Sequence, residues 1–427
     1  MSTLLTPLEL QSFESGMQAF AEALEAELPN AIESRRQLHG IAARSGQEGK
    51  AVEFIAAMMG IELLPVAGTG GVAKIGSATS GAIAIRAELD ALPMTEQTGV
   101  AWASTNGHMH ACGHDVHQAA LVALARAAKK VADVLPAPVV PILQPREEAY
   151  PSGAQDIVES GLLDRLGVEA VVGAHVHPRV NIGEVAAGYG PINAAADTVE
   201  VRFSGGGGHG AYPHEASSPV LAIAHTISEL EGLVRRTVSP MHPAVISVGH
   251  IESGNAANVV PTVGVLSATV RSMRQKDRDR LHEAITEVIE HNAKLQSLTV
   301  EIDIINGEPV LENTPSLVDE FNRLSHSEGR NVVALMRSCG SDDFSFYSAK
   351  YRSIMAFVGV ETEGMDTQPS LHHARFLPTD RSVGDVARAL LTQYRAAAAV
   401  VLAEGARSTL EATDSKHLTT DPKELNV

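Results

Sequence analysis

Residues 118–144 have the sequence QAALVALARAAKKVADVLPAPVVPILQ, in which an apolar helical pattern leads into an apolar β pattern. Residues 118–134 are rich in Ala and Leu, which favour a helix, and residues 138–143 form a short apolar run typical of a buried strand. Further strand candidates lie at 71–75, 82–86 and 170–174. Because such strands alternate with helices, the sequence predicts an α/β fold with a mostly parallel sheet.

The pattern changes at about residue 193, and this change marks an inserted domain. Residues 193–308 predict the order strand, helix, strand, strand, helix, strand, which is typical of a two-layer α+β unit. Helices and strands alternate again after residue 308. We therefore expect a mostly parallel-sheet domain at 1–192 and 309–412, interrupted by an α+β domain at 193–308 and followed by a polar tail at 413–427.

The composition argues against several classes of protein. The 427 residues carry a net charge of −18, whereas proteins that bind nucleic acids or anionic membranes need a basic surface. No apolar run approaches the ~20 residues that cross a bilayer, and the acidic first forty residues do not resemble a secretory signal. Two cysteines, Cys112 and Cys339, do not make a disulfide framework. We expect a cytoplasmic protein with no nucleic-acid or membrane partner.

The eighteen histidines stand out because many of them lie in short clusters. The segment MHACGHDVH at 109–117 places Cys112 and His114 two residues apart in a glycine-containing loop, so both side chains can converge on one ion. A thiolate and an imidazole suit zinc or a neighbouring first-row metal. His175 and His372 offer further ligands of the right kind. The sequence therefore predicts a metal site, which parallel strands place in the loops at their carboxyl ends.

Two adjacent glutamates, Glu147 and Glu148, follow the strand predicted at 138–143. Adjacent residues on a loop point in different directions, so one carboxylate can bind the metal while the other faces bound water. A glutamate pair taken alone is more often a solvated loop. A catalytically silent metal-binding scaffold would need only the ligand, and a thiol enzyme would use Cys112 as its nucleophile. The second glutamate favours a hydrolase over the scaffold, and a thiol enzyme would be inactivated by alkylating agents but not by chelators.

Eight motifs occur in one order between residues 109 and 376, within a match that runs from about residue 35 to residue 395: MHACGHDVHQAA, QPREEAYPSGA, GAHVHP, GGGGHGAYPH, NAANVVP, VRSM, CGSDDFSFY and LHHARF. Together they resemble the aminoacylase/hippurate-hydrolase family of cocatalytic metallohydrolases, which are related to glutamate carboxypeptidases. MHACGHD with the spaced glutamate pair is the most specific of these motifs, whereas GGGGHG alone is weak.

The resemblance implies a catalytic domain that binds one or two divalent transition-metal ions per subunit, such as manganese, zinc or cobalt. Glu147 would be the general base that takes a proton from metal-bound water and passes it to the leaving nitrogen. Asp90 would be a carboxylate that orients a ligand. The implied metal ligands are Cys112, His114, Glu148, His175 and His372.

The resemblance also implies a role for the inserted domain as a lid and dimerisation domain. His209 would reach across a homodimer, or a higher homo-oligomer, to polarise the scissile group of a small-molecule substrate. Asn258 and Arg271 would meet a substrate carboxylate, for which an arginine fork is suited.

The sequence departs from the family pattern at positions outside the implied ligands. Ala87-Glu88 replaces the usual Ala-Asp, Arg146 precedes the glutamate pair where a small residue is common, and Asp342 stands where a glutamate is expected. Two reactions on a C–N bond of a small carboxylate-bearing substrate are therefore considered. One is the hydrolysis of N-acyl amino acids, and the other is the release of ammonia from an aryl amine, as in 5-nitroanthranilate aminohydrolase.

Overall fold

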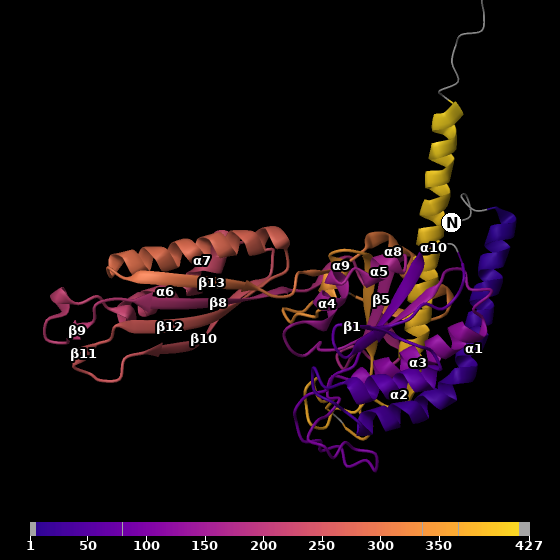
Figure 1. Ribbon diagram of the computed structural model, residues 1–427, viewed down its shortest axis with the longest axis horizontal. Helices are drawn as coiled ribbons and strands as arrows, with labels where there is room; N and C mark the ends of the chain where they lie inside the picture. Colours follow the sequence, from indigo (N-terminus) through magenta and orange to yellow (C-terminus); the bar gives the residue numbers. More distant parts are fainter. Residues whose placement is uncertain (1–5, 79, 335, 366, 418–427) are drawn as a thin grey trace, which may run out of the picture. The chain divides into compact units, whose positions relative to one another are not determined.

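The computed structural model describes residues 6–78, 80–334, 336–365 and 367–417 and divides into two compact units (Figure 1). The first unit comprises Met1–Gly190, Asn313–Met336 and Lys350–Val427, and the second comprises Pro191–Glu312 and Arg337–Ala349. The predicted α/β fold with an inserted α+β part is confirmed. The expected boundaries 193–308 lie close to Pro191–Glu312, but they omit Arg337–Ala349, a later segment that packs within the second unit.

The first unit is built on an eight-stranded sheet, and the centre of this sheet is parallel. β3 pairs in parallel with both β4 and β5, and β5 pairs in parallel with β16. Antiparallel pairs join β1 to β2, β2 to β4 and β16 to β6, and β6 pairs in parallel with β15. In sheet order the strands are β1 (Leu64–Val66), β2 (Gly70–Val72), β4 (Val139–Gln144), β3 (Ala82–Glu88), β5 (Val168–His177), β16 (Arg352–Gly359), β6 (Glu184–Ala186) and β15 (Asn331–Val333).

Two helices, α3 (His114–Lys130), which is almost entirely buried, and α10 (Arg381–His417), pack on the central strands and on each other. The many alanines of α3 are almost completely buried, which lets this helix approach its neighbours closely. The remaining helices of this unit are α1 (Pro7–Gly40), which packs along α3, α2 (Gly49–Met59), α4 (Gly153–Glu159), α5 (Leu162–Arg165) and α8 (Pro315–Ser327).

Helix α10 contains a stretch, Arg381–Arg407, that is long and apolar enough to cross a membrane. However, 67% of the apolar window is buried inside the protein, and Leu390 and Tyr394 belong to the core of the first unit. Packing therefore accounts for its apolar character. The helix continues to His417, so the start of the expected polar tail at 413–427 is helical, and the rest of that tail lies outside the described residues.

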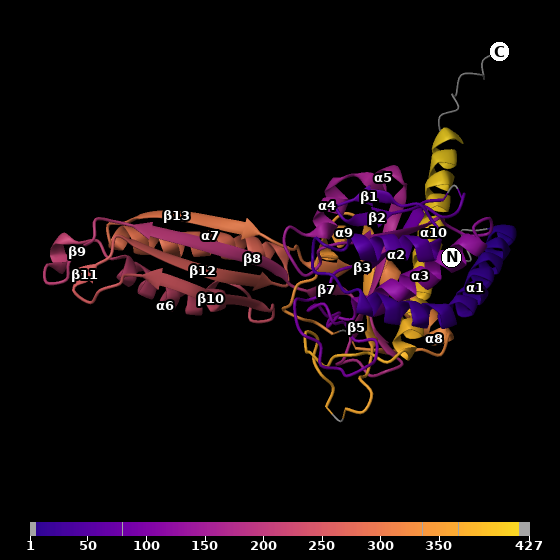
Figure 2. The same cartoon turned by 60° about the horizontal axis from the view of Figure 1, so that its bottom comes forward.

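The second unit is a two-layer α+β structure. Its antiparallel sheet has the strand order β10 (Ala244–Ser253), β12 (Val263–Ser272), β8 (Ala195–Ser204) and β13 (Thr299–Asn306). The helices α6 (Pro219–Thr237) and α7 (Gln275–Leu295) pack against each other on one face of this sheet (Figure 2). Alternate residues of β8, such as Val201 and Phe203, share the core with Leu281 of α7.

Several short elements complete the fold. β9 pairs with β11, and β7 pairs with β14, so each pair forms a small sheet of its own. The bounds of these elements are β7 (Gly190–Asn193), β9 (Gly208–His209), η1 (Pro213–Glu215), β11 (Val259–Val260), β14 (Leu311–Asn313) and α9 (Ser345–Ser348).

Candidate metal centre

The residues of the predicted metal site lie at the carboxyl ends of neighbouring parallel strands in the first unit. Asp90 follows β3, Glu147 and Glu148 follow β4, and His175 lies near the end of β5. His114 is the first residue of α3. These side chains, which come from positions as far apart in the chain as 90 and 175, therefore meet at one edge of the sheet, as expected for a site in an α/β fold.

The loop before α3 depends on Gly113. This residue has φ 84°, and a Cβ at this position would lie only 2.4 Å from Val176 Cγ2 on β5. Glycine thus allows the loop to turn and to approach β5 closely. On the other side of the loop, the backbone N–H of His372 donates to Ala111 O at 2.9 Å, which places His372 beside Cys112.

Two histidines are oriented by backbone carbonyl groups. His114 Nδ1 lies 2.9 Å from Asp90 O, and His175 Nδ1 lies 2.7 Å from Val176 O. A carbonyl oxygen only accepts hydrogen bonds, so each Nδ1 carries the proton and each Nε2 keeps a lone pair for a ligand. His175 Nε2 lies 3.4 Å from Cys112 Sγ, and His114 Nε2 is buried without a hydrogen-bond partner in the described structure.

Glu148 faces His372 and is fixed by Asp90. Glu148 Oε1 lies 3.2 Å from His372 Nε2, and the backbone N–H of Glu148 donates to Asp90 Oδ2 at 2.9 Å. The Ser45 hydroxyl donates to the same Asp90 oxygen at 2.6 Å. One ligand atom each from Cys112, Glu148 and His372 lie within 4.8 Å of one another. Asp90 therefore orients the loop of Glu148 with its carboxylate and the ring of His114 with its carbonyl.

Glu147 lies on the other side of the glutamate pair. Its Oε2 atom is 3.9 Å from His114 Nε2, and its side chain is 13% exposed. The two adjacent carboxylates thus point to different histidines, Glu147 to His114 and Glu148 to His372. One ligand atom each of His114, Glu147 and Glu148 lies within 4.8 Å of the other two, so both carboxylates border the candidate metal centre.

The electrostatics of the cluster fit a divalent cation. Burial raises the pKa of the Cys112 thiol well above its usual value, and Glu148 and Glu147 raise it further. Burial also lowers the pKa of His175 well below its usual value, so its imidazole is neutral. A bound cation would stabilise the thiolate form of Cys112. The converging sulfur, nitrogen and oxygen donors suit a first-row transition metal.

A second cluster of possible ligands, formed by Glu88, His114, His117 and His175, does not suit a metal ion. Both ring nitrogens of His117 are engaged, because Nδ1 lies 2.9 Å from Glu88 Oε2 and the backbone N–H of Val176 donates to Nε2 at 3.0 Å. Glu88 Oε1 is paired with Arg86. The sequence pattern alone assigns no role to His117 or Glu88, although an acidic residue just after the strand predicted at 82–86 is a usable signal.

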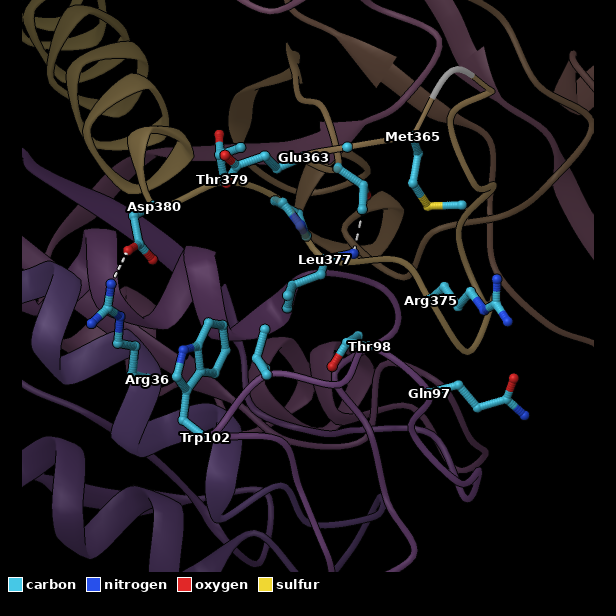
Figure 3. Close-up of a pocket in the computed structure, with 14 residues that line it drawn as sticks. Arg36, Gln97, Thr98, Trp102, Glu363, Met365, Arg375, Leu377, Thr379 and Asp380 are labelled. Atoms are coloured by element: carbon cyan, nitrogen blue, oxygen red, sulfur yellow. Dashed lines mark hydrogen bonds and ion pairs between the residues drawn. The ribbon is translucent and has the colours of Figure 1, made fainter.

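A cavity of about 810 Å³ lies beside the loop that carries His372 (Figure 3). Trp102 lines this cavity. Its ring contacts the ring of His39 edge-on, with 4.9 Å between the two centroids. Arg36 and Asp380, which also line the cavity, form an ion pair at 2.5 Å. None of the five proposed ligands is among the described residues that line the cavity, so it is distinct from the metal centre.

The three lid residues lie in two places within the second unit. His209 is on β9 and Asn258 directly precedes β11, and these strands lie beyond one end of the four-stranded sheet (Figure 1). Arg271 lies near the opposite end of β12, opposite Ala196, and its guanidinium donates to Ser341 Oγ at 3.0 Å. The strand from Val263 to Arg271 spans about 26 Å at ~3.3 Å per residue, and Asn258 lies before Val263 in the chain. A single copy therefore does not bring Asn258 and Arg271 to one carboxylate.

Comparisons with known proteins identify the family. Residues 84–392 match Peptidase family M20/M25/M40. The N-acetyl-L-cysteine deacetylase of Bacillus subtilis (strain 168) is 34% identical over 348 residues, which cover 80% of this chain and 82% of that protein. An IAA-amino acid hydrolase of Arabidopsis thaliana is 34% identical over 321 residues, which cover 73% of this chain and 72% of that protein.

A solved structure agrees with these relatives. The YXEP protein of Bacillus subtilis, described as a dinuclear metal-binding peptidase of the M20 family, superposes with a TM-score of 0.74 and 28% identity. The match covers 89% of this chain and 99% of that one. The resemblance to aminoacylases and hippurate hydrolases is therefore confirmed. The chain belongs to peptidase family M20/M25/M40 and is one of the hydrolases of this family.

Proposed function

We propose that the protein is a metal-dependent amidohydrolase that releases free amino acids from N-acyl amino acids. Relatives named for N-acetyl-L-cysteine and N-acetyldiaminopimelate deacetylation support this substrate class. The proposed ligands of one or two manganese, zinc or cobalt ions are Cys112, His114, Glu148, His175 and His372. The lone pairs of His114 Nε2 and His175 Nε2 are available for such ions because both Nδ1 atoms bond to carbonyl groups.

The division of the glutamate pair carries this proposal. A divalent ion bound in the centre would supply Lewis acidity toward an amide carbonyl and a neighbouring water. Glu147 would accept a proton from water at a carboxylate oxygen and donate it to the leaving nitrogen. Glu148 stays beside His372, held through its backbone by Asp90. A scaffold that only binds metal would have no use for the carboxylate of Glu147.

The same residues would serve an aryl-amine hydrolase of the 5-nitroanthranilate type, since both reactions break a C–N bond with water. The products separate the two reactions. The metal-loaded protein should be incubated with a panel of N-acyl amino acids and aminobenzoates, and both free amino acid and ammonia should be measured. Our proposal expects the amino acid from the acylated substrates. Ammonia from the aminobenzoates alone would assign the protein to the other reaction.

We further propose that two copies of the chain complete the substrate site. Asn258 precedes β11, before the start of β12 at Val263, whereas Arg271 lies near the end of β12, so a carboxylate that contacts both would lie between two copies. His209 shares the β9–β11 sheet with the backbone of Asn258 and would come from the same copy as Asn258. A homodimer is the simplest assembly with this property.

The two cysteines suit a reducing compartment such as the cytoplasm, which we propose as the location. Both thiols are free, and Cys112 must remain reduced to act as a metal ligand. Fractionation of cells with an antibody against the protein tests this location.

A further inference from the structure

A chain of buried polar groups extends from β3 to the end of β5 behind the proposed ligands. Arg86 and Glu88 form an ion pair on β3, and Arg86 Nε also donates to Gln144 Oε1 at 2.8 Å. Glu88 Oε2 lies 2.9 Å from His117 Nδ1, and the backbone N–H of Val176 donates to His117 Nε2 at 3.0 Å. These side chains are at most 1% exposed, so water does not replace their interactions.

The hydrogen bonds fix both the tautomer and the position of His117. Since the backbone N–H of Val176 can only donate, His117 Nε2 is the acceptor and Nδ1 carries the proton that is donated to Glu88. The His117 ring also contacts the ring of His175 edge-on, with 4.8 Å between their centroids. His117 thus touches the proposed ligand His175 at two points, through the ring and through the peptide group that follows it.

The length of the Glu88 side chain lets one carboxylate reach two partners. In the structure this glutamate spans the space between Arg86 and His117, with one oxygen atom on each. Arg86 balances the charge that Glu88 brings into a buried strand, so the carboxylate can hold His117 without an uncompensated charge.

We propose that Glu88 and His117 are positioning residues that hold His175 in place for metal binding, with Glu88 acting through His117. This inference rests on the metal centre of the proposed function. Partners of this kind behind a metal ligand typically contribute 10- to 100-fold in metal affinity. The effect should therefore appear in the binding of the metal itself, independently of any substrate.

The test measures the dissociation constants of Zn²⁺ and Mn²⁺ by calorimetry on the metal-stripped full-length protein, together with the absorption spectrum of its Co²⁺ complex. His117→Asn keeps a donor to Glu88 but loses the acceptor for Val176, and Glu88→Gln removes the charge. We expect each variant to bind metal about 10- to 100-fold more weakly and to shift the Co²⁺ bands. Glu88→Asp should recover part of the loss, because it restores the carboxylate.

A double variant and a control separate positioning from general stability. If Glu88 acts through His117, the losses in Glu88→Gln/His117→Asn should be smaller than the sum of the single losses. Tyr394→Phe removes a buried hydrogen bond to Ala137 O (2.6 Å) elsewhere in the first unit and should leave metal affinity unchanged. Folded single variants that bind metal like the wild type, or fully additive losses, would overturn the inference. If the wild-type protein bound no metal, the proposed function would fail as well.

Discussion

His175 Nε2 lies 3.4 Å from Cys112 Sγ, although the two residues are 63 positions apart in the chain. The contact joins the end of β5 to the loop before α3, and Gly113 makes it possible because any larger residue there would collide with Val176. The candidate metal centre thus depends on how closely this loop can approach the parallel sheet.

The first prediction concerns the division of work between the two glutamates. Glu147→Gln keeps the size of the side chain but cannot accept a proton, so turnover should fall by ~10²-fold or more. Its metal content should stay normal, because Glu148 is the proposed ligand. Glu148→Gln is the matched control and should lose metal. Kinetics and elemental analysis of both variants check this, and metal loss in Glu147→Gln would show that the two roles are reversed.

The second prediction concerns the two thiols. Cys112 is buried, and in the metal-loaded protein its sulfur would be bound to the ion and so shielded from the reagent. Cys339 is exposed. Iodoacetamide at pH 7.5 should therefore label Cys339 in the metal-loaded protein and leave Cys112 and the activity intact, as peptide mass spectrometry can show. Rapid labelling of Cys112 with parallel loss of activity would instead favour a thiol enzyme.

The third prediction concerns pH and His39. This buried ring lies 3.0 Å from both Asp115 and Glu96. Burial opposes its charge, but the two carboxylates raise its pKa to about 9, above the ordinary 6.5. The charged His39 therefore contributes about 3 kcal/mol to the free energy of unfolding. This contribution is fully present below pH 6.5 and is lost as the pH rises through 9.

Urea unfolding between pH 6 and pH 9.5 measures this effect. The free energy of unfolding of the wild type should fall over this range more steeply than that of His39→Gln, which lacks the titrating group. Parallel pH profiles for the two proteins would mean that His39 is not charged in the folded state.

The fourth prediction concerns the second unit. Arg271→Ala should mainly raise KM, through lost binding of a substrate carboxylate, and His209→Ala should lower kcat. Because Asn258 lies before the start of β12 and Arg271 near its end, we expect the site to use two copies. Mixing His209→Ala with Glu147→Gln subunits should then restore part of the activity. Hybrid dimers that form but stay as inactive as their parents would contradict a shared site.

The sequence predicted the elements that carry the metal centre because their signals are local. The spacing of Cys112 and His114 and the position of Glu147 after an apolar strand can be seen in short segments. The role of His117 could not be predicted in this way. It lies in the same histidine cluster, and only its hydrogen bonds to Glu88 and from the Val176 N–H show that both of its nitrogens are engaged.

Long-range packing explains the other differences. Arg337–Ala349 follows a helix and a strand of the first unit in the chain, yet it belongs to the second unit. Part of the reason is a set of backbone hydrogen bonds that Ser338 makes with Ile192 and Ala194, more than 140 positions away. The separation of Asn258 from Arg271 likewise became visible only with the direction and length of β12.

The most direct test of the whole account is the release of amino acid from N-acetyl amino acids, including N-acetylcysteine, by the purified protein before and after metal removal. We predict release by the metal-loaded protein, loss of activity after chelation, and recovery on addition of Mn²⁺, Zn²⁺ or Co²⁺. Activity that persists in protein shown by elemental analysis to contain no metal would contradict the account.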